Sequence, residues 1–438
     1  MAEAKGKLGI LVGGGPAPGI NGVIAAATVE AIHNGLEVVG IYDGFKWLMR
    51  GETRHTTPLS IGDVSQARVR GGSILHTSRD NPTKKPETMA AVLAGLETLG
   101  IRYLVTIGGD DTAFSASQVA RAAKGRLRVA HVPKTIDNDL PLPGNMPTFG
   151  FQTARTLAAE LVRNLVEDAR TTRRWYIAIL MGRSAGHLAL GSGTVANATL
   201  SIIPEEFASN GCSLDLICSI IEGAMIKCKT VEHDYGVACI AEGVGLLVGE
   251  EIARKYEGNP FVEIEWDAHG NLRLGEIPLG LILKRELQAR ARERAKARGE
   301  DPKKAKLALV DVTIGYDLRC AAPIPFDADY TQELGWGAVR YLLRIGEGDY
   351  TAEHGALISV QAGEVVPIPF SEILDEKLGK TAVRRVNVNS DLYRAARSNM
   401  IRLERKDFES PEQLARLAEA AGLSPEEFRG KFAPVVGL

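Results

Sequence analysis

Residues 8–33 read LGILVGGGPAPGINGVIAAATVEAIH, and this stretch indicates the fold class. It opens with a short apolar run, Leu8–Val12, of the kind that forms a buried strand. The glycine- and proline-rich segment 13–19 ends that strand. The alanine-rich segment Ile20–His33 then predicts a helix, which Gly35 closes at a C-cap position. The order strand, glycine loop, helix is typical of an α/β protein.

The same unit recurs further along the chain. Helices are predicted over 86–99 and 112–123, with a buried strand over 101–107 between them. A further strand, 127–132, leads into the polar segment 133–139. Strands that alternate with helices predict a parallel sheet covered on both faces.

A second block of elements begins near Pro141. We expect helices over 152–170 and 214–229 and strands over 175–181 and 236–241. Serine, proline and a capping-box partner at Ser410 and at Ser424 predict two short terminal helices. The segment 284–306 is dense in Lys and Arg, and we interpret it as a solvated helix and loop rather than a binding face.

Composition excludes several classes of protein. The 438 residues include 52 basic and 54 acidic side chains, and a net charge of −2 argues against nucleic-acid binding through a dense basic surface. No apolar run approaches the ~18 residues that span a bilayer, and the first residues lack the apolar core of a signal peptide, so we expect a cytoplasmic protein with no membrane partner. The five cysteines show no C-x-x-C pair and the histidines no cluster, which predicts reduced thiols and no structural transition metal.

The glycine loop, 13–19, opens a helix, where bare backbone N–H groups and the helix dipole favour a phosphate. It is not a Walker A sequence, because Ile20 and Asn21 stand where Lys and Ser or Thr are required. It is not a dinucleotide fingerprint either, since Pro18 occupies the third glycine position. A plain tight turn stays an equal alternative.

Carboxylates follow the next two predicted strands. Asp110 and Asp111 lie on a glycine turn, where they suit Mg²⁺, although Asp111 or Thr112 could instead cap the following helix. Asp137 and Asp139 are two residues apart, so in an extended segment they point the same way.

Together with Lys134, Asp137 and Asp139 could supply a base, a metal contact and a point charge, whereas a polar surface turn is the alternative. In a parallel sheet all these segments fall at the carboxyl edge, where ligands bind. The three loops suggest phosphoryl transfer with Mg²⁺, and the residues alone lead as far as a phosphate-handling α/β enzyme.

These segments resemble the motifs of the phosphofructokinase family, and the similarity extends over most of the chain. Residues 13–21 are similar to its donor-phosphate loop, 108–112 to its metal loop and 133–139 to its catalytic signature. Residues 181–183, 241–243 and 315–319 resemble the segments that hold fructose 6-phosphate. The segments occur in the family's order.

The resemblance implies two Rossmann-like three-layer α/β/α lobes with mainly parallel sheets and an active site in the cleft between them. Residues 1–140 are expected to bind the donor phosphate and Mg²⁺ and to carry the catalytic loop. Residues 141–400 are expected to bind the sugar phosphate, with the chain crossing back to the first lobe around 245–320. Residues 401–438 would form a C-terminal helical extension.

The donor is implied by a second point of resemblance. Asp111 and Lys134 stand where ATP-using members generally have glycine, and pyrophosphate-dependent members share the residues found here. The Asp111 carboxylate would repel a nucleotide α-phosphate, and Lys134 offsets the charge of pyrophosphate. The implied reaction is reversible, Mg²⁺-dependent transfer from pyrophosphate to the C1 hydroxyl of fructose 6-phosphate. An ATP-dependent kinase and a catalytically silent regulatory subunit stay as alternatives.

The resemblance also implies a role for individual residues. Asp137 accepts the proton of the C1 hydroxyl, with Lys134 and Asp111 beside it in the catalytic set, and Asp110 holds Mg²⁺. Gly14 and Arg79 contact pyrophosphate. The residues expected at the sugar phosphate are Thr135, Ile136, Asp137, Met181, Gly182, Arg183, Glu242, Tyr316 and Arg319. Arg174 matches a position from which the family reaches a neighbouring subunit's substrate, which implies a homodimer or homotetramer.

Overall fold

The computed structural model describes residues 6–208, 211–259, 262, 277–344, 355–375 and 380–438, and the chain forms two compact units. The first unit combines residues 1–154 with 316–384, and the second combines 155–315 with 385–438. The chain passes between the units at 154/155, 315/316 and 384/385. The return at 315/316 falls within the range 245–320 where we expected the chain to cross back to the first lobe.

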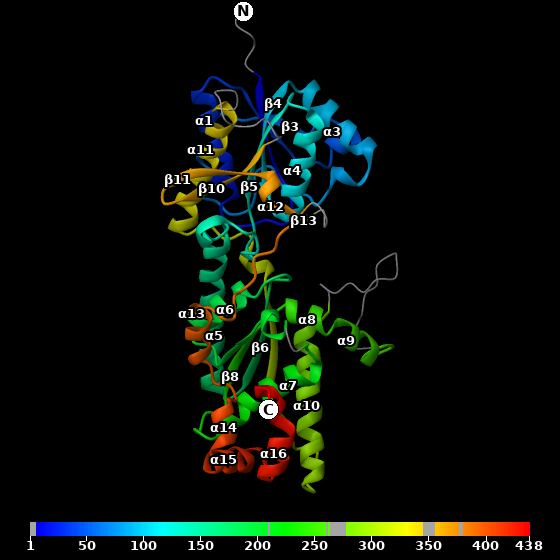
Figure 1. Ribbon diagram of the computed structural model, residues 1–438, viewed down its shortest axis with the longest axis vertical. Coiled ribbons are helices and arrows are strands. Elements are labelled where there is room, and N and C mark those ends of the chain that lie inside the picture. The colour runs from blue at the N-terminus through cyan, green and yellow to red at the C-terminus, as the bar shows by residue number, and fades with distance from the viewer. Residues whose placement is uncertain (1–5, 209–210, 260–261, 263–276, 345–354, 376–379) are drawn as a thin grey trace, which may run out of the picture. The chain divides into compact units, whose positions relative to one another are not determined.

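The first unit is built on a seven-stranded sheet of order β11-β10-β5-β4-β1-β2-β3 (Figure 1). Its five inner strands run parallel, whereas the edge strands β11 and β3 are antiparallel to their neighbours. The strands are β1 Lys7–Val12, β2 Val38–Ile41, β3 Thr56–Pro58, β4 Ile101–Gly108, β5 Arg128–Pro133, β10 Ala356–Gln361 and β11 Glu364–Pro369. This confirms the predicted parallel sheet and adds a C-terminal hairpin, β10–β11, to its edge.

Helices cover both faces of this sheet because its strands are apolar on both sides. In β1, Ile10 and Val12 pack against α1 and α11, while Leu11 faces the cluster that holds α3 and α4. The helices of the unit are α1 Ile20–His33, α2 Ile61–Ser65, α3 Pro86–Thr98, α4 Asp110–Ala123, α11 Pro325–Arg344 and α12 Phe370–Ile373. Short 3-10 turns lie at η1 Leu48–Arg50, η2 Pro82–Lys84, η3 Pro143–Asn145 and η6 Tyr316–Leu318, and β12 Leu374–Asp375 pairs with β13 Lys380–Thr381.

The second unit holds a four-stranded parallel sheet of order β7-β8-β6-β9. Its strands are β6 Trp175–Leu180, β7 Leu200–Ile202, β8 Gly236–Ala241 and β9 Leu309–Ile314. Its helices are α5 Phe151–Thr172, which begins in the first unit, α6 His187–Val195, η4 Pro204–Phe207, α7 Leu214–Lys229, α8 Gly243–Leu247, α9 Gly249–Lys255, α10 Leu279–Ala297 and α13 Asp391–Ser398. At the C-terminus lie α14 Arg405–Glu409, α15 Pro411–Ala421, α16 Pro425–Phe432 and η7 Ala433–Val436. The side chains of Ser410 and Ser424 cap α15 and α16, as predicted.

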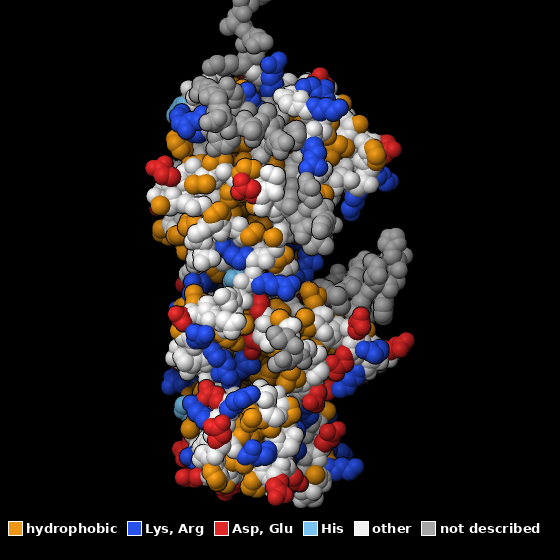
Figure 2. Space-filling model, in the orientation of Figure 1, with side chains coloured by type: hydrophobic (Ala, Val, Ile, Leu, Met, Phe, Trp, Pro, Cys, Tyr) orange, Lys and Arg blue, Asp and Glu red, His pale blue; other side chains and the backbone are white. Residues whose placement is uncertain are grey.

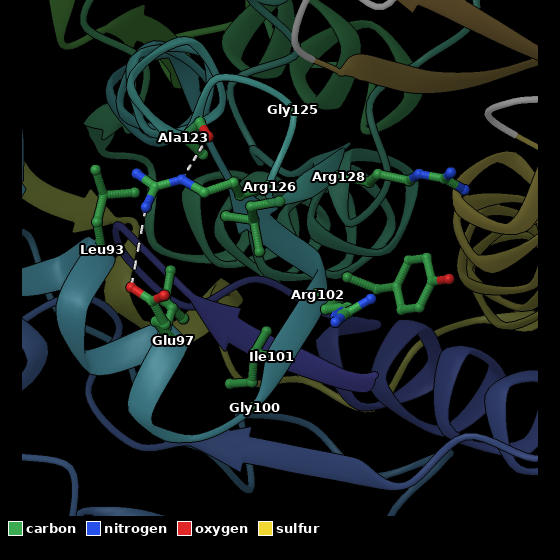
Figure 3. A pocket seen from close by; sticks show the side chains of 12 residues that line it. Leu93, Glu97, Gly100, Ile101, Arg102, Ala123, Gly125, Arg126 and Arg128 are labelled. Atoms are coloured by element: carbon green, nitrogen blue, oxygen red, sulfur yellow. Dashed lines mark hydrogen bonds and ion pairs between the residues drawn. The ribbon is translucent and has the colours of Figure 1, made fainter. Parts of the chain in front are cut away.

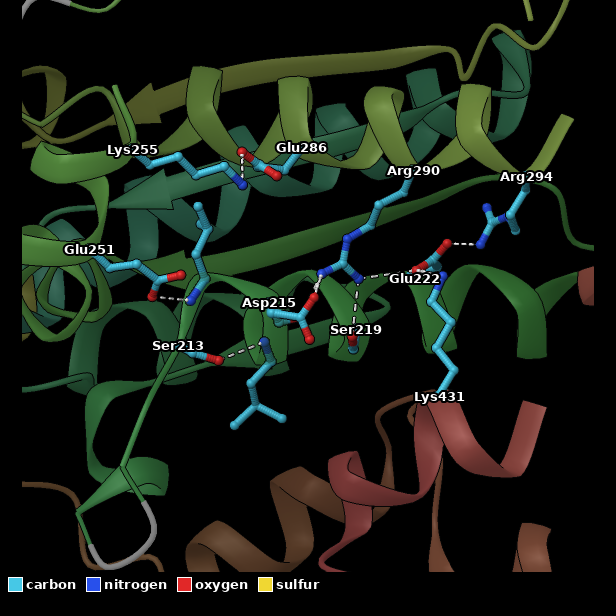
Figure 4. Close-up of polar contacts among 12 residues, drawn as sticks. Ser213, Asp215, Ser219, Glu222, Glu251, Lys255, Glu286, Arg290, Arg294 and Lys431 are labelled. Atoms are coloured by element: carbon cyan, nitrogen blue, oxygen red, sulfur yellow. Dashed lines mark hydrogen bonds and ion pairs between the residues drawn. The ribbon is translucent and has the colours of Figure 1, made fainter. Parts of the chain in front are cut away.

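A buried glutamate ties the basic helix α10 to its neighbours. Glu222 of α7 is 3% exposed and pairs with Arg290 at 3.2 Å and with Arg294, both from α10 (Figure 4). Lys431 of α16 approaches the same carboxylate at 3.5 Å. The interpretation of 284–306 as a solvated segment is therefore wrong for the face of α10 that packs on α7, since Arg290 and Arg294 are mostly buried there and paired with Glu222.

On the face shown in Figure 2, basic and acidic side chains are mixed, in line with the nearly equal numbers of the two in the sequence. Among the described residues, no helix combines the length and the apolar character needed to cross a membrane.

Candidate active site

Three loops of the first unit meet at one edge of its sheet. Strand β4 lies between β1 and β5, with Val12 paired to Ile107 and Ile107 to Val132. Because the three strands run parallel and in register, the loops 13–19, 108–112 and 133–139 leave the same carboxyl edge side by side. The register thus brings together the segments that the sequence singled out.

Two glycines let the first two loops close around Thr112. A Cβ on Gly13 would lie 2.4 Å from the Thr112 hydroxyl, and a Cβ on Gly108 would lie 2.3 Å from Thr112 Cβ. Thr112 is buried, so no larger residue fits at either glycine. The Gly13 N–H donates to Ile107 O at 2.8 Å, which joins the two loops directly.

Lys134 lies at the centre of this loop cluster. It is 4% exposed, its Nζ donates to Gly15 O, and a Cβ on Gly14 would lie 3.2 Å from that nitrogen. Burial lowers the Lys134 pKa to about 8, Arg319 and Arg79 act in the same direction, and Asp137 and Asp110 oppose them. The side chains that act on its charge are therefore the ones predicted for the site. The Gly14 N–H already donates to Ser78 O at 2.8 Å. The predicted contact of Gly14 with pyrophosphate would therefore come from a close approach to its backbone, which has a φ of 80° and no side chain.

The two aspartates of the second loop begin a helix but do not cap it. The N-cap of α4 is Gly109, which has no side chain, and Asp110 and Asp111 are the first two helical residues. The capping alternative for Asp111 or Thr112 is therefore wrong. Both carboxylates are exposed in the first turn, where the positive end of the helix dipole favours them.

The third loop is not extended, contrary to our expectation. Asn138, between Asp137 and Asp139, adopts φ 57°, a left-handed conformation that Asn tolerates. Burial raises the pKa of Asp139, and the charge of Asp110 raises it further, so these two carboxylates face a common region. Asp137, by contrast, acts on Lys134. In this loop Asp137 therefore lies near Lys134, whereas Asp139 lies near Asp110.

The remaining predicted residues of the first unit are spread around this cluster. Arg319 lies 3.6 Å from the position of a Gly15 Cβ, and its guanidinium stacks 4.7 Å from the ring of Tyr316, which is 79% exposed. Arg79 is exposed, one residue beyond Ser78, which bridges to Gly13. Thr135 Oγ1 accepts a hydrogen bond from the Asp137 N–H at 3.0 Å. The Ile136 side chain is 5% exposed, so a contact with substrate would come from its backbone.

The second unit gathers its predicted residues in the same way. β6 lies between β8 and β9, with Leu180 paired to both Ala241 and Ile314. Met181, Gly182 and Arg183 therefore follow β6 beside Glu242, which follows β8. The Glu242 carboxylate accepts from the Gly182 N–H at 3.4 Å, and the Gly243 N–H donates to Gly182 O at 3.0 Å.

Arg174 lies apart from this group, because it precedes β6 and so sits at the amino edge of that sheet. Its Nε lies 3.9 Å from Asp168 Oδ2, and its side chain is 38% exposed. The chain itself does not bring Arg174 to the loop 181–183 within this unit.

Two anchoring residues were missed from the sequence. Glu205 is 8% exposed and accepts from the Gly186 N–H at 2.9 Å, just after the loop 181–183, and from the Val386 N–H at 2.9 Å. Arg384 donates to Asn138 O at 3.0 Å. Neither has a local signal, because its partners lie far away in sequence.

A cavity of about 600 Å³ lies at the other, amino edge of β4 and β5 (Figure 3). Arg102, Arg126 and Arg128 line it beside the C-terminal ends of α3 and α4. Arg126 Nε donates to Ala123 O, in the last turn of α4, at 3.2 Å. Because helix C-termini carry partial negative charge, the helix ends account for these arginines, and the candidate site stays at the carboxyl edge.

For ligands, the described residues contain no group of three or more His, Cys, Asp or Glu side chains that could hold a metal ion alone. A pair of carboxylates such as Asp110 and Asp139 is nonetheless enough for a hard divalent cation that takes its other ligands from water and substrate. What the fold and the loops define is a two-unit α/β protein whose glycine loop, buried lysine and carboxylates gather at the carboxyl edge of one parallel sheet.

Comparison with known proteins identifies the family to which this α/β protein belongs. The family described as Phosphofructokinase matches residues 7–342, and the chain belongs to this family. A relative from Thermotoga maritima, named pyrophosphate–fructose 6-phosphate 1-phosphotransferase, is 55% identical over 99% of this chain and 98% of its own. One from Naegleria fowleri with the same name is 46% identical over 97% of this chain and 94% of its own.

Solved structures share the fold. The structure of phosphofructokinase from Saccharomyces cerevisiae matches with a TM-score of 0.61 at 19% identity, over 98% of this chain and 50% of the yeast chain. This chain therefore spans about half the length of that yeast chain.

Proposed function

We propose that this chain is a pyrophosphate-dependent 6-phosphofructokinase, a reversible Mg²⁺-dependent phosphotransferase. It moves a phosphoryl group from inorganic pyrophosphate to the C1 hydroxyl of fructose 6-phosphate, giving fructose 1,6-bisphosphate and phosphate. The observation that carries the proposal is the set of charges around the buried Lys134, where Arg319, Arg79, Asp137 and Asp110 all act. The names of the two near-full-length relatives support the same assignment.

The preference for pyrophosphate rests on Asp111 and Lys134. Asp111 is exposed at the start of α4, one residue after Asp110, and its negative charge disfavours a third phosphate there. The Lys134 pKa of about 8 leaves the ammonium form predominant at neutral pH, so Lys134 carries a positive charge next to Gly14 and Gly15. Together they favour a short, highly charged donor.

Asp110, with the help of Asp139, would hold Mg²⁺. The charge of Asp110 raises the pKa of the half-buried Asp139, so the two carboxylates repel each other in the protein alone. A divalent cation there would relieve that repulsion, and two protein carboxylates with water and phosphate oxygens match the ligands that Mg²⁺ prefers. When bound, the ion supplies charge stabilisation for the transferred phosphoryl group.

Asp137 is the base of the reaction. Its carboxylate accepts the proton of the C1 hydroxyl as that oxygen attacks the phosphorus, and phosphate leaves. In a loose phosphoryl transition state the hydroxyl becomes acidic late, so a carboxylate is sufficient. Lys134 and Arg79 orient the donor beside Gly14 and offset charge on the leaving phosphate.

The first unit supplies the donor and metal residues, and the second supplies Met181, Gly182, Arg183 and Glu242 to the sugar phosphate. Tyr316 and Arg319, expected at the sugar, belong to the first unit, with Arg319 against the donor loop. The substrates are pyrophosphate and fructose 6-phosphate, with no role for nucleic acid or membrane. The assembly is a homodimer or homotetramer in which Arg174 reaches a neighbouring subunit's substrate, and its cytoplasmic location stays a prediction.

The test compares initial rates of fructose 1,6-bisphosphate formation with Mg²⁺ and either pyrophosphate or ATP as sole donor. We expect activity with pyrophosphate and little with ATP. Asp137→Ala should lower the rate by several orders of magnitude, whereas Asp329→Ala, an exposed aspartate on α11, should not change it. Activity only with ATP would establish the kinase alternative, and a silent Asp137→Ala would support a regulatory subunit.

A further inference from the structure

Arg384 holds the catalytic loop from a position 246 residues further along the chain. Its Nε donates to Asn138 O at 3.0 Å, one Nη donates to Met146 O at 2.7 Å, and the other donates to Asn138 Oδ1. Its backbone N–H also donates to Asp139 O at 2.7 Å. One residue therefore binds the loop at both ends of the segment 138–146.

Other hydrogen bonds of the loop include local ones, from the Leu142 N–H to Leu140 O at 2.9 Å and from the Met146 N–H to Pro143 O at 3.3 Å. Asn138 is the residue that turns the chain into φ 57°, and its carbonyl and side chain both accept from Arg384. The Asn138 Oδ1 also accepts from the Thr148 N–H at 3.0 Å. Between β5 and α5 the chain forms one short 3-10 turn, so side-chain hydrogen bonds replace the ladder that fixes a strand.

The position of Asn138 makes this contact relevant to chemistry. Asn138 lies between Asp137 and Asp139, so a change in its backbone angles redirects both carboxylates. Arg384 is also close enough to Asp139 for the two charges to act on each other. Only a guanidinium offers several donors in one rigid plane, which is what three acceptors at fixed places require.

We propose that Arg384 is a positioning residue for phosphoryl transfer, one that fixes Asn138 and so aims Asp137 and Asp139. This proposal rests on the proposed function above. Arg384 acts through the loop, so losing it should slow the chemical step more than it weakens substrate binding. A displacement of about 1 Å in reacting groups can cost on the order of 100-fold in rate.

The experiment compares Arg384→Ala with Arg385→Ala, because Arg385 is the exposed next residue and has the same charge. In Arg384→Ala we expect kcat to fall about 10- to 100-fold, with KM for both substrates within about threefold of wild type. Guanidinium ion at low concentration should restore part of the rate in Arg384→Ala. Arg385→Ala should behave like wild type.

A second readout is independent of the reaction. Amide hydrogen exchange of peptides covering 134–149 should be faster in Arg384→Ala than in wild type or Arg385→Ala, with other parts of the first unit unchanged. If Arg384→Ala does not fold, Arg384→Lys carries the test, since its ammonium can keep one carbonyl contact but not all three. We then expect an intermediate kcat and intermediate exchange.

The outcomes separate the two proposals. If wild type is inactive with pyrophosphate and Arg384→Ala still loosens 134–149, the proposed function fails while the anchoring of the loop stands. If exchange in 134–149 is unchanged, Arg384 does not hold the loop. If kcat falls only together with global stability and is not rescued by guanidinium, Arg384 is a structural residue. Either outcome overturns the proposal.

Discussion

In the proposed function, Asp111 selects the donor by its charge, without binding it. It follows Asp110 directly in the first turn of α4, so the two carboxylates share a loop but not a direction. In the proposed function, Asp110 would hold the cation together with Asp139, whereas the charge of Asp111 would oppose a longer donor. At this scale the choice of donor is a matter of like charges.

Replacing Asp111 should therefore change donor preference. We expect Asp111→Gly to lower kcat/KM for pyrophosphate by about 10-fold and to make ATP use measurable, because like charges brought together cost several kcal/mol. Asp111→Asn keeps the size and removes the charge, so it should reproduce the gain of ATP use. The measurement is kcat/KM for each donor, and unchanged preference in both variants would refute the charge argument.

His131 gives the first unit a dependence on pH. It is fully buried in β5, with Nδ1 2.9 Å from Thr106 Oγ1 and Nε2 3.1 Å from Gly108 O. Burial lowers its pKa from 6.5 to about 3, so the folded protein keeps it neutral while the unfolded chain protonates below about pH 6.5. Stability should therefore fall as pH drops from 6.5 towards 3, by up to about 1.4 kcal/mol per pH unit.

The check is the free energy of unfolding by urea between pH 7 and pH 4.5. We expect His131→Gln to be less stable at pH 7 but to lose less on acidification than wild type. His33→Gln, at an exposed residue of α1, should follow wild type. Parallel curves for wild type and His131→Gln would show that other groups cause the acid sensitivity.

At the scale of elements, a single carboxylate decides where α5 begins. Asp327 of α11 is fully buried and accepts from the Gly150 N–H at 2.9 Å, the Thr153 N–H at 2.8 Å and Thr153 Oγ1 at 2.6 Å. These donors belong to the first turn of α5, whose N–H groups have no partner within the helix. A side chain 174 residues away thus does the work of an N-cap.

Removing that cap should cost stability. We expect Asp327→Ala to lower the free energy of unfolding by about 2–4 kcal/mol, since it leaves three buried donors unsatisfied. Asp327→Asn retains an acceptor and should cost less. Asp329→Ala, two residues on and exposed, is the control. A change below about 0.5 kcal/mol in Asp327→Ala would mean that water or a shifted backbone replaces the cap.

At the scale of the whole molecule, the chain passes three times between its units, at 154/155, 315/316 and 384/385. The third crossing follows Arg384, which donates to Asn138 in the first unit, and precedes Val386, which donates to Glu205 in the second unit. Each unit therefore combines two segments that lie far apart in the sequence.

The proposed assembly has its own test. In solution we expect a mass of at least twice the 47.0 kDa of the chain. Arg174→Ala should raise KM for fructose 6-phosphate by about 10-fold through a lost charged hydrogen bond, with KM for pyrophosphate unchanged. Arg170→Ala, which removes an exposed arginine of α5, is the matched control. A monomeric mass with unchanged KM in Arg174→Ala would contradict the shared site.

The local sequence pattern determined the bounds of several helices and strands. The helices Ile20–His33 and Leu214–Lys229 and the strand Gly236–Ala241 follow the predicted bounds, because apolar periodicity and end signals are written within each segment. The parallel sheet and the loops at its carboxyl edge follow from the alternation of strands and helices, and the resemblance supplied the family.

Only the tertiary structure decided how those segments are joined and held. The order of the sheet, the hairpin β10–β11 at its edge and the return of 316–384 to the first unit depend on contacts between distant segments. The same is true of Arg384 on Asn138, Asp327 on α5, Glu205 on Gly186 and the arginines of α10 on Glu222. A side chain that satisfies a buried donor or charge far away in sequence leaves no local periodicity, so its partner emerges only when the chain has folded.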